Sequence, residues 1–341
     1  MPQDAFEIQK VRFLTKVRFA IPKGHLAEST LDTLGRAGYI VSGGDRTYRP
    51  SINDPMIEAK ILRPQEIPLF VGEGLQDVGI TGRDWLRETK ADVRVLLDLE
   101  YSQVRLVLAV PKQWSDVNSL SDLLEKLAKE EKVLRLSTEY LNLATEHLKA
   151  NPTYKQLFGD LEPVVVTPWW RRGENNKAAI YLSFGATEAK PPEDADAIVE
   201  VVETGLSMDQ NNLKIVETVL ESSAVLIANT DALKNPSKRE KIYDILTLLK
   251  GVVDGRKKLH IFVNVREENV QKLVESLPAL KSPTIAPLSE KGWFSVNTVI
   301  DKRVFLEILP TLRKLAQGLV VYEPRQVLPL ESIDIEEKNH E

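Results

Sequence analysis

Residues 195–208, with the sequence ADAIVEVVETGLSM, place acidic side chains and a Thr-Gly-x-Ser turn at the end of an apolar strand. The turn runs from Thr204 to Ser207, and its backbone N–H groups and two hydroxyls can converge on one anion. If a helix begins there, its N-terminus adds to the attraction for a phosphate. The neighbouring carboxylates suit the 2- and 3-hydroxyls of a ribose, which donate hydrogen bonds. The segment therefore fits a ribose 5-phosphate.

Strand alternation limits which carboxylate can face such a ligand. Glu200 and Glu203 lie an odd number of residues apart, so a regular strand sends them to opposite faces. We choose Glu200, with Asp196 or Glu203 as its companion. Taken alone, however, the segment is more often a capped strand-to-helix turn with solvated acids, because serine, threonine and glycine are common in turns.

Composition narrows the class of protein. The 341 residues exceed what one hydrophobic core usually serves, so two or three domains are expected. The net charge of −5 argues against a chain-wide grip on nucleic acid, although a local basic pocket is compatible with it. The absence of cysteine excludes disulfides, thiolate catalysis and cysteine-ligated metals. The four histidines form no closely spaced pair, which argues against a histidine zinc site.

The sequence also favours a cytoplasmic location with no membrane contact. No apolar run approaches the length that spans a bilayer. Residues 1–16 contain no apolar core like that of a signal peptide. We therefore expect a cytoplasmic enzyme.

The elements that position the turn follow an α/β pattern. Short β-branched runs alternate with helix-length periodic segments, which predicts parallel strands connected by helices. Ser119 is expected to cap the helix that follows it. In the first 236 residues, strands are expected over 17–21, 56–62, 77–81, 104–110, 133–137, 164–167 and 197–202, and two further apolar runs over 215–229. Helices are expected over 25–37, 64–72, 83–88, 119–129 and 140–149.

This order predicts two α/β lobes joined by crossing strands, with a cleft between them. Lobe I comprises residues 1–105 together with 210–236, which return to it, and lobe II comprises residues 106–209. The phosphate turn belongs to lobe II.

Residues 237–330 are expected to form a separate domain. After a helix over 237–251, strands and helices alternate in the order βαββαβ, which is typical of a ferredoxin-like, ACT-like module. The module has no glycine-rich phosphate loop and no cluster of catalytic residue types, so we interpret it as regulatory or structural. Residues 331–341 are charged and are predicted to be a disordered tail.

From Val17 to about Tyr322 the chain resembles the long form of ATP phosphoribosyltransferase. No single motif is decisive, but five occur in the family's order at compatible spacings. They are Ala20–Gly24, Phe70–Asp84, Phe184–Glu188, the turn at Thr204–Ser207 and Leu226–Asn229. Pro283-Thr284 and Trp293 are similar to landmarks of the family's C-terminal domain.

The resemblance implies a fold, a reaction and a set of ligands. The two lobes would have a type II periplasmic-binding-protein architecture. N1 of ATP would attack C1 of phosphoribosyl pyrophosphate (PRPP) and release pyrophosphate, with Mg²⁺ on the pyrophosphate. This is the first step of histidine biosynthesis. L-Histidine would be the inhibitor, and the chain would form a homo-oligomer, either a dimer or a hexamer.

The resemblance also implies site residues. The catalytic residues would be Glu200 and Lys23. The PRPP-binding residues would be Glu188, Asp196, Glu200, Thr204, Gly205, Leu206 and Ser207. The ATP-binding residues would be Lys23, Gly24, His25, Arg49, Arg63, Asp77, Gly79 and Thr81. Ser282, Thr284 and Ser295 would form the allosteric site, and no protein metal ligands are assigned.

The chain departs from the family pattern in three places. The family usually has arginine where this chain has His25, aspartate where it has Glu200, and Thr-Leu where it has Ser207-Met208. Because neutral imidazole cannot replace a guanidinium on phosphate, Arg46 or Arg49 could take over the role at His25. The segment Thr167–Ile180 is also longer than usual, and we favour a surface loop with buried tryptophans over a lid that lines the cleft.

Several of these residues have a purely structural alternative. Lys23 could be a solvated turn lysine, Arg63 a surface ion pair, Asp77 and Gly79 a tight turn, and Glu188 a helix cap. Two other classes of protein also remain open: a two-lobed protein that binds small anions without chemistry, and a non-catalytic regulatory paralogue.

Overall fold

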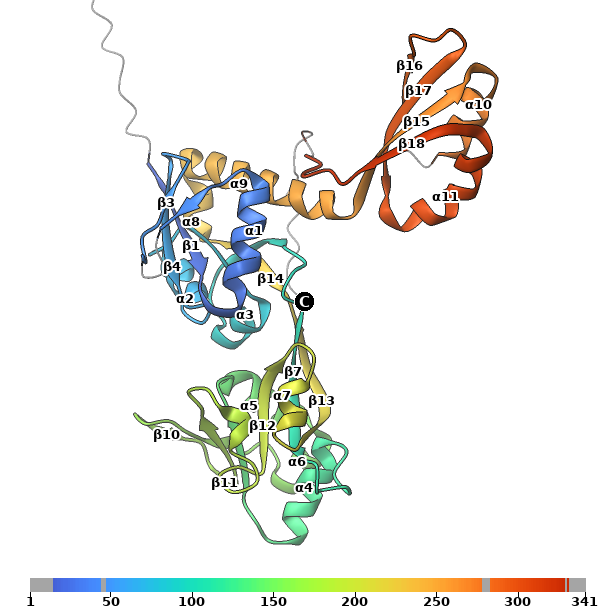
Figure 1. Ribbon diagram of the computed structural model, residues 1–341. Helices are drawn as coiled ribbons and strands as arrows, with labels where there is room; N and C mark the ends of the chain where they lie inside the picture. Colours follow the sequence, from blue (N-terminus) through green and yellow to red (C-terminus); the bar gives the residue numbers. More distant parts are fainter. Residues whose placement is uncertain (1–14, 44–46, 278–282, 329, 331–341) are drawn as a thin grey trace, which may run out of the picture. The chain divides into compact units, whose positions relative to one another are not determined.

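The computed structural model describes residues 15–43, 47–277, 283–328 and 330 (Figure 1). The chain divides into two compact units, one formed by residues 18–29 and 60–232 and the other by the remaining described residues. Arg46 and Ser282 lie outside the described residues, as does the tail expected over 331–341. Among the described helices, none is both long enough and apolar enough to cross a membrane.

The first sheet has five strands in the order β4-β1-β5-β14-β6. β1 is parallel to β5, whereas β14, which arrives from much later in the chain, is antiparallel to both of its neighbours. An antiparallel strand inserted in this way is what the expected periplasmic-binding-protein architecture requires. The strands are β1 (Val17–Pro22), β4 (Ile57–Leu62), β5 (Val78–Gly82), β6 (Arg94–Asp98) and β14 (Ala224–Ala228).

Short helices connect these strands. They are η1 (Gly24–Leu26), α1 (Ala27–Ala37), α2 (Ile67–Gly72) and α3 (Arg83–Thr89), and a two-stranded ribbon of β2 (Val41–Ser42) and β3 (Ser51–Ile52) follows α1. Ala20 of β1 packs with Ile67 and Val71 of α2 and with Val225 and Ile227 of β14. The core therefore includes residues about 200 positions apart in the sequence.

The second sheet has seven strands in the order β10-β9-β11-β8-β12-β7-β13. β9, β11, β8 and β12 run parallel, whereas β7 and β13 are antiparallel partners at one edge. The strands are β7 (Val104–Pro111), β8 (Leu134–Thr138), β9 (Pro163–Val166), β10 (Arg171–Arg172), β11 (Asn175–Leu182), β12 (Ala197–Val202) and β13 (Leu213–Ser222). Of the two apolar runs expected over 215–229, only the second, β14, returns to the first sheet.

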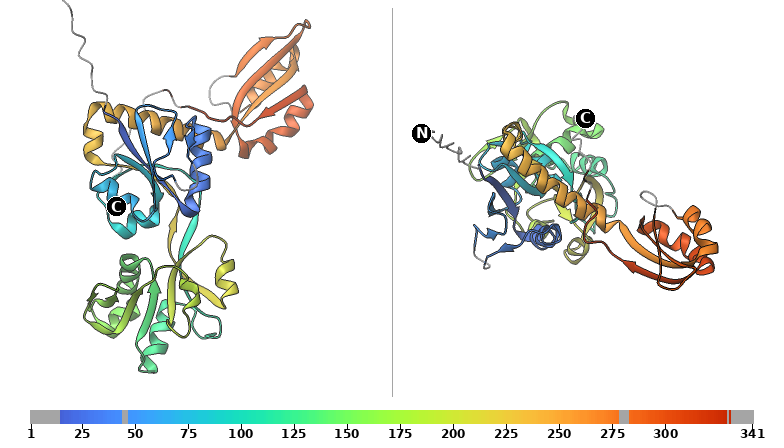
Figure 2. Two further views of the ribbon diagram at one scale, coloured as in Figure 1. Left: turned by 60° about the vertical axis from the view of Figure 1, so that its left-hand side comes forward. Right: turned by 90° about the horizontal axis from the view of Figure 1, so that it is seen from above.

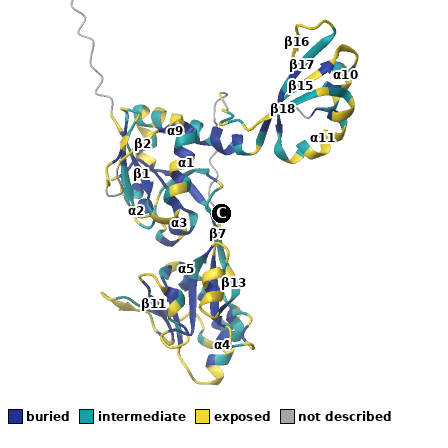
Figure 3. Cartoon of the chain, viewed as in Figure 1, coloured by how far each residue is buried: buried dark blue, intermediate teal, exposed yellow. Residues whose placement is uncertain are grey.

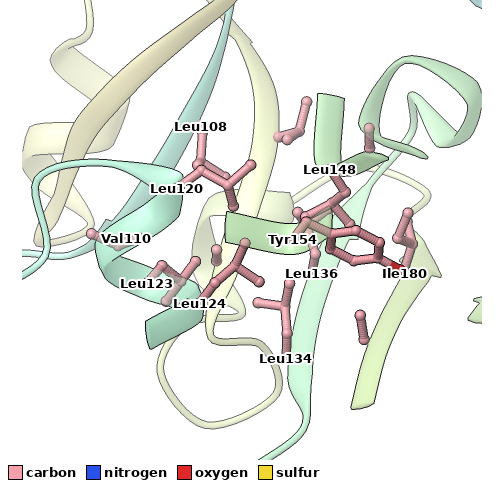
Figure 4. Packing of buried hydrophobic residues seen from close by; sticks show 14 of the residues in the cluster. Leu108, Val110, Leu120, Leu123, Leu124, Leu134, Leu136, Leu148, Tyr154 and Ile180 are labelled. Atoms are coloured by element: carbon pink, nitrogen blue, oxygen red, sulfur yellow. The ribbon is translucent and has the colours of Figure 1, made fainter. Parts of the chain in front are cut away.

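One face of the second sheet is covered by α4 (Leu120–Lys129), α5 (Leu141–Ala150) and α6 (Pro152–Phe158). Ser119 caps α4 as expected, because its hydroxyl accepts a 3.1 Å hydrogen bond from the N–H of Asp122. Figure 4 shows Leu120 and Leu123 of α4 and Tyr154 of α6 packed around Leu136 of β8. This apolar layer fixes the strands whose ends carry the candidate site.

The C-terminal domain, from β15 to β18, has the predicted βαββαβ order. Its sheet order β16-β17-β15-β18 is that of a ferredoxin-like module, and every pairing in it is antiparallel. Its elements are β15 (Lys258–Arg266), α10 (Glu267–Ser276), β16 (Thr284–Pro287), β17 (Trp293–Asp301), α11 (Lys302–Leu315) and β18 (Ala316–Tyr322). The 21-residue helix α9 (Pro236–Arg256) precedes it, after α8 (Thr230–Lys234). Figure 2 shows α10 and α11 on the same face of this sheet.

Burial follows this arrangement (Figure 3). The central strands β5 and β14 are buried along their whole length, whereas β16 of the C-terminal domain is exposed along its whole length. The strongly alternating pattern of β15, buried at Leu259, Ile261, Val263 and Val265, leaves the opposite face of its sheet open.

Candidate active site

The candidate site lies at the carboxyl edge of the second sheet. β8, β11 and β12 are parallel and neighbouring, so their carboxyl ends meet at one edge. The residues that follow these ends are Glu139 after β8, Ser183 after β11 and Glu203 after β12. Ligands of open α/β sheets bind outside this edge. The phosphate turn, which we define as Thr204–Ser207, is therefore where a ligand is expected.

The phosphate turn joins β12 directly to the short helix α7 (Leu206–Gln210). Gly205 has φ +84°, which is the left-handed region that favours glycine. Thr204 and Ser207 are exposed, and Met208 is buried against Val202. The first turn of α7 has backbone N–H groups without intrahelical acceptors. The phosphate turn thus exposes two hydroxyls and several backbone N–H donors, and the buried side chain of Met208 fixes its position.

Glu200 lies on the same face of β12 as Ile198 and Val202, the face that α7 covers. Its side chain is half-buried, and its Oε1 accepts a 2.9 Å hydrogen bond from the N–H of Val201. The hydroxyl of Thr187, on the 3₁₀ turn η2 (Thr187–Ala189), also donates to its carboxylate. Glu200, Thr187 and Glu188 are therefore brought together beside the phosphate turn.

Burial raises the pKa of Glu200 above its ordinary value. The hydrogen bonds from Thr187 and Val201 oppose the rise, because they stabilise the carboxylate. Glu139 and Glu188 add to it by repulsion. The site therefore holds one desolvated carboxylate flanked by two others, an arrangement suited to a ligand that donates hydrogen bonds.

A second cluster follows β1 in the first sheet. The N–H of Lys23 donates a 2.9 Å hydrogen bond to the carbonyl of Leu62, so Lys23 lies beside Arg63. Gly24 has φ +75°, and no atom lies within 4 Å of where its Cβ would be. Gly24, His25 and Arg63 are exposed. The structure thus brings together four of the eight residues predicted to bind ATP.

Two family models match the chain. The model described as HisG: ATP phosphoribosyltransferase matches residues 63–251, and the model described as HisG, C-terminal domain, matches residues 255–325. An ATP phosphoribosyltransferase of Chlorobaculum parvum is 38% identical over 318 residues, which cover 92% of this chain and 97% of that protein. One of Solibacter usitatus is 37% identical over 92% of this chain and 99% of that protein.

The chain belongs to the ATP phosphoribosyltransferase family. A chain of the solved ATP phosphoribosyl transferase (HisG:HisZ) complex from Thermotoga maritima is similar in fold, with a TM-score of 0.53 and 22% identity. The similarity covers 70% of this chain and 98% of that one. The sequence-based prediction of the family, with a catalytic region followed by a C-terminal domain, is therefore confirmed.

Asp196 lies apart from the phosphate turn. It precedes β12, whereas the phosphate turn follows it, so the strand separates them. Its buried carboxylate accepts hydrogen bonds from Arg135, at 2.9 Å from Nη2 and 2.8 Å from the backbone N–H. The prediction that Asp196 helps to bind the ribose does not fit this geometry, because both of its carboxylate oxygens already accept hydrogen bonds from Arg135.

Replacing Asp196 by asparagine should therefore lower stability without changing PRPP affinity. Arg135 is about one-third exposed, so solvent compensates part of the lost ion pair, and the expected loss is about 1–2 kcal/mol. For a chain of 341 residues that corresponds to a fall in Tm of roughly 1–3 °C. Thermal denaturation and PRPP titration of the same preparation check it. A weaker affinity for PRPP at unchanged Tm would mean that Asp196 does bind the ribose.

Three residues of the first sheet have internal roles that account for them without ATP. Asp77 is 2% exposed and pairs with Arg18, whose Nη2 lies 2.7 Å from its Oδ1. A Cβ on Gly79 would lie 2.6 Å from Ile67 Cγ2, so glycine permits the packing of α2. The hydroxyl of Thr81 donates a 2.8 Å hydrogen bond to the carbonyl of Pro64. We assign all three to the fold, where the sequence had suggested ATP.

The tryptophan segment differs from the sequence-based interpretation. Trp169 is 73% exposed and Trp170 is 39% exposed, so the expectation of buried tryptophans is wrong. Trp169 meets the exposed Phe184 edge-on, with ring centroids 6.0 Å apart, and Arg172 lies over the ring of Trp170. β10 pairs antiparallel with β9, so the extra residues form a hairpin that projects their rings outward.

A cavity of about 480 Å³ beside the crossing strands was not anticipated from the sequence. Its lining includes Arg105 of β7, Glu203 just after β12 and Glu221 of β13. Arg83 and Asp98 on its wall form a 3.0 Å ion pair. Glu203 thus faces this cavity and not the Glu200 side of β12, which agrees with strand alternation. No local pattern predicts the cavity, because its lining comes from four distant segments.

Two of the three predicted allosteric residues are described. Ala286 pairs with Ser295 and Thr284 pairs with Asn297, so Thr284 and Ser295 lie on one face of the C-terminal sheet, on neighbouring strands. Arg49, predicted to bind ATP, is exposed beside β3.

Proposed function

We propose that the chain transfers the phosphoribosyl group of PRPP to N1 of ATP, producing N1-(5-phosphoribosyl)-ATP and pyrophosphate. This reaction is the first step of L-histidine biosynthesis. The observation that carries the proposal is the similarity to ATP phosphoribosyltransferases over 92% of the chain. The phosphate turn and Glu200, side by side at the edge of one sheet, support it.

The phosphate turn holds the 5-phosphate of PRPP. Thr204 and Ser207 supply hydroxyl donors, and Gly205 and Leu206 supply backbone N–H donors. Glu200 accepts hydrogen bonds from the ribose hydroxyls, and we assign Glu188, whose charge acts on Glu200, to the same ligand. Both contacts orient C1 of the ribose without contacting the bond that breaks.

The chemical step then needs little from the protein beyond position and charge. The lone pair of adenine N1 forms a bond to C1, while the C1–O bond breaks and its electron pair leaves with pyrophosphate. N1 carries no proton, so no general base is required. Positive charge develops on the ribose ring and negative charge on the leaving group, and fixed dipoles and charges stabilise both.

Lys23 is the catalytic cation in this proposal, since an ammonium can neutralise the phosphates of ATP or the departing pyrophosphate. Arg63 lies beside it, and Gly24 lets a ligand approach the backbone closely. His25 and Arg49 are the further candidates for the phosphates of ATP.

Mg²⁺ fits the pyrophosphate of the substrate, because it prefers phosphate oxygens and a few waters or carboxylates. Within the described ranges, no three or more His, Asp or Glu side chains converge on a point where a metal could sit. We therefore assign no step to a protein-bound ion.

One assay tests the proposal directly. The full-length chain is incubated with ATP, PRPP and Mg²⁺, and phosphoribosyl-ATP and pyrophosphate are measured. We expect both products in equal amounts. PRPP binding without pyrophosphate release would indicate a two-lobed small-anion binding protein. Product only after addition of another subunit would indicate a regulatory paralogue.

The C-terminal domain is proposed to bind L-histidine as an inhibitor. A free amino acid needs an acceptor for its ammonium and donors for its carboxylate. The hydroxyls of Thr284 and Ser295 share one face of the sheet and can supply those donors. Effectors of this kind work through a coupling of about 1–3 kcal/mol. The alternative is that this domain only builds the homo-oligomer.

Replacing Ser295 by aspartate should remove histidine inhibition while leaving kcat unchanged, because a second carboxylate repels that of histidine. The point substitution is preferable to deletion, since Lys241 of α9 pairs with Asp54 at 3.2 Å and α9 therefore supports another part of the chain. Activity against added histidine is measured for the full-length protein and for the variant Glu290→Gln, which serves as the control. Insensitivity of the unaltered protein would leave the domain a structural role.

A further inference from the structure

Lys190 follows η2, and nothing so far gives it a role. Its ammonium donates a hydrogen bond to the hydroxyl of Ser183 and another, at 3.2 Å, to the hydroxyl of Ser137. Ser137 and Ser183 are 2% and 1% exposed. None of the ion pairs formed among the described residues includes Lys190. The chain thus directs a charged donor at two buried hydroxyls.

The two hydroxyls connect Lys190 to the candidate site. Ser183 Oγ lies 2.9 Å from Thr187 Oγ1, and Thr187 is 0% exposed. Thr187 in turn donates to the carboxylate of Glu200. The connection is therefore Lys190–Ser183–Thr187–Glu200, and its two middle members are shielded from water.

The register of the sheet shows that these groups share one face. Ser137 is opposite Ile198, so its side chain points to the same face as Glu200, two residues further along β12. Tyr181 is opposite Ser137, so Ser183 would continue on this face beyond the end of β11.

Lys190 determines the direction in which the hydrogen bonds of this connection donate. An ammonium can only donate, so Ser183 accepts from Lys190 and keeps its own proton for Thr187 or for the carbonyl of Gly185, at 3.2 Å. The bond to Thr187 is the shorter one. Thr187 then accepts from Ser183 and donates to Glu200. Hydrogen bonds in such a series polarise one another, and a charged donor strengthens them.

Glu200 needs this support because of its neighbours. It is desolvated, and Glu139 and Glu188 both repel its charge. Both effects disfavour the ionised form, which is the form that accepts hydrogen bonds at both oxygens.

We propose that Lys190 is a positioning residue for PRPP, which acts through Ser183 and Thr187 to hold Glu200 ionised and oriented toward the ribose hydroxyls. The inference rests on the proposed function, since it concerns the same site. Lys190 itself does not contact PRPP.

A double-mutant cycle tests this role. Lys190→Met should raise the KM for PRPP about tenfold and leave the KM for ATP within about twofold, because it removes the charged donor that polarises the hydrogen bonds leading to Glu200. Lys190→Arg should recover most of the loss, since it keeps the charged donor. In a Glu200→Gln background, Lys190→Met should have no further effect, because the group through which it acts is already neutral.

Additive effects of Lys190→Met and Glu200→Gln would overturn the proposal, since they would mean that the ammonium contacts substrate directly. So would a Lys190→Met enzyme with unchanged KM for PRPP. Ser183→Ala breaks the same connection without removing the charge, and it serves if Lys190→Met does not fold. Lys177→Met, on the exposed opposite end of β11, is the matched control. Absence of phosphoribosyl-ATP with the unaltered chain would instead reject the proposed function.

Discussion

Replacing Gly205 by valine is expected to abolish PRPP binding, with a loss of at least about 100-fold in affinity. Gly205 has φ +84°, where a β-branched residue is strongly disfavoured. Its Cβ would meet only Ile215 Cδ1 at 3.7 Å, an ordinary contact, so the space itself is open. The damage should therefore come from a distorted phosphate turn and from side-chain atoms where the 5-phosphate approaches the backbone. Calorimetric titration with PRPP measures it.

Two variants separate backbone strain from loss of the ligand contact. Gly159→Val places valine at φ +65° with no atom within 4 Å of its Cβ, beyond the C-terminus of α6 and away from the phosphate turn. It should lower the Tm but preserve PRPP affinity. Gly205→Ala should fall between wild type and valine. If Gly205→Val bound PRPP with wild-type affinity, the 5-phosphate would lie elsewhere.

The strand-to-helix geometry of the phosphate turn was predictable because its signal is local. Thr204, Gly205 and Ser207 lie within four consecutive residues, and the apolar residues just before them indicate the strand that leads into the turn. The βαββαβ domain was predictable for a similar reason, since every second residue of β15 is buried and the residues between them are partly or fully exposed. Where the signal is carried by neighbouring residues, the sequence suffices.

The partners of Asp196 and Asp77 could not be predicted in this way. Each pairs with an arginine about 60 residues away, and nothing near Asp196 indicates that Arg135 will lie beside it. β11 was missed because it begins with polar Asn175, Asn176 and Lys177, which resemble a loop, although the three residues that follow, 178–180, are buried. Tertiary context overrides local preference at such places.

The Lys190 connection shows the same limit at the site itself. Ser137, Ser183, Thr187 and Lys190 come from three segments, and each has an unremarkable local context. Only the register of β8, β11 and β12 places them on the face of Glu200. The resemblance to a family supplied the candidate site residues that lie in motifs, whereas the residues proposed to support them required the structure.

Glu200→Gln is expected to lower kcat/KM for PRPP about 10- to 150-fold, corresponding to about 1.5–3 kcal/mol for a charge-assisted hydrogen bond. Glutamine keeps the size of the side chain and one acceptor oxygen, but its amide group presents a donor to the ribose hydroxyls. Asp196→Asn makes the same chemical change just before the start of the same strand and should leave kcat/KM for PRPP unaltered. Steady-state kinetics with PRPP varied at saturating ATP distinguish the two variants.

The pH dependence of the same reaction gives an independent view of Glu200. The carboxylate is the form that accepts hydrogen bonds, and burial raises the pKa of Glu200 above its ordinary value. The groups that face it are Glu139, Glu188 and Tyr140, with Lys190 acting through hydroxyls. As pH falls, Glu200 should take up a proton at a higher pH than an ordinary glutamate, whose pKa is about 4.3, and kcat/KM for PRPP should fall with it.

The phosphates of PRPP also titrate, at about pH 6, so the informative quantity is the difference between the pH profiles of the wild-type and Glu200→Gln enzymes. The Glu200→Gln enzyme should lack the component due to Glu200. Identical profiles for the two enzymes, together with a gap in kcat/KM of less than about threefold at neutral pH, would exclude Glu200 as the ligand of the ribose hydroxyls.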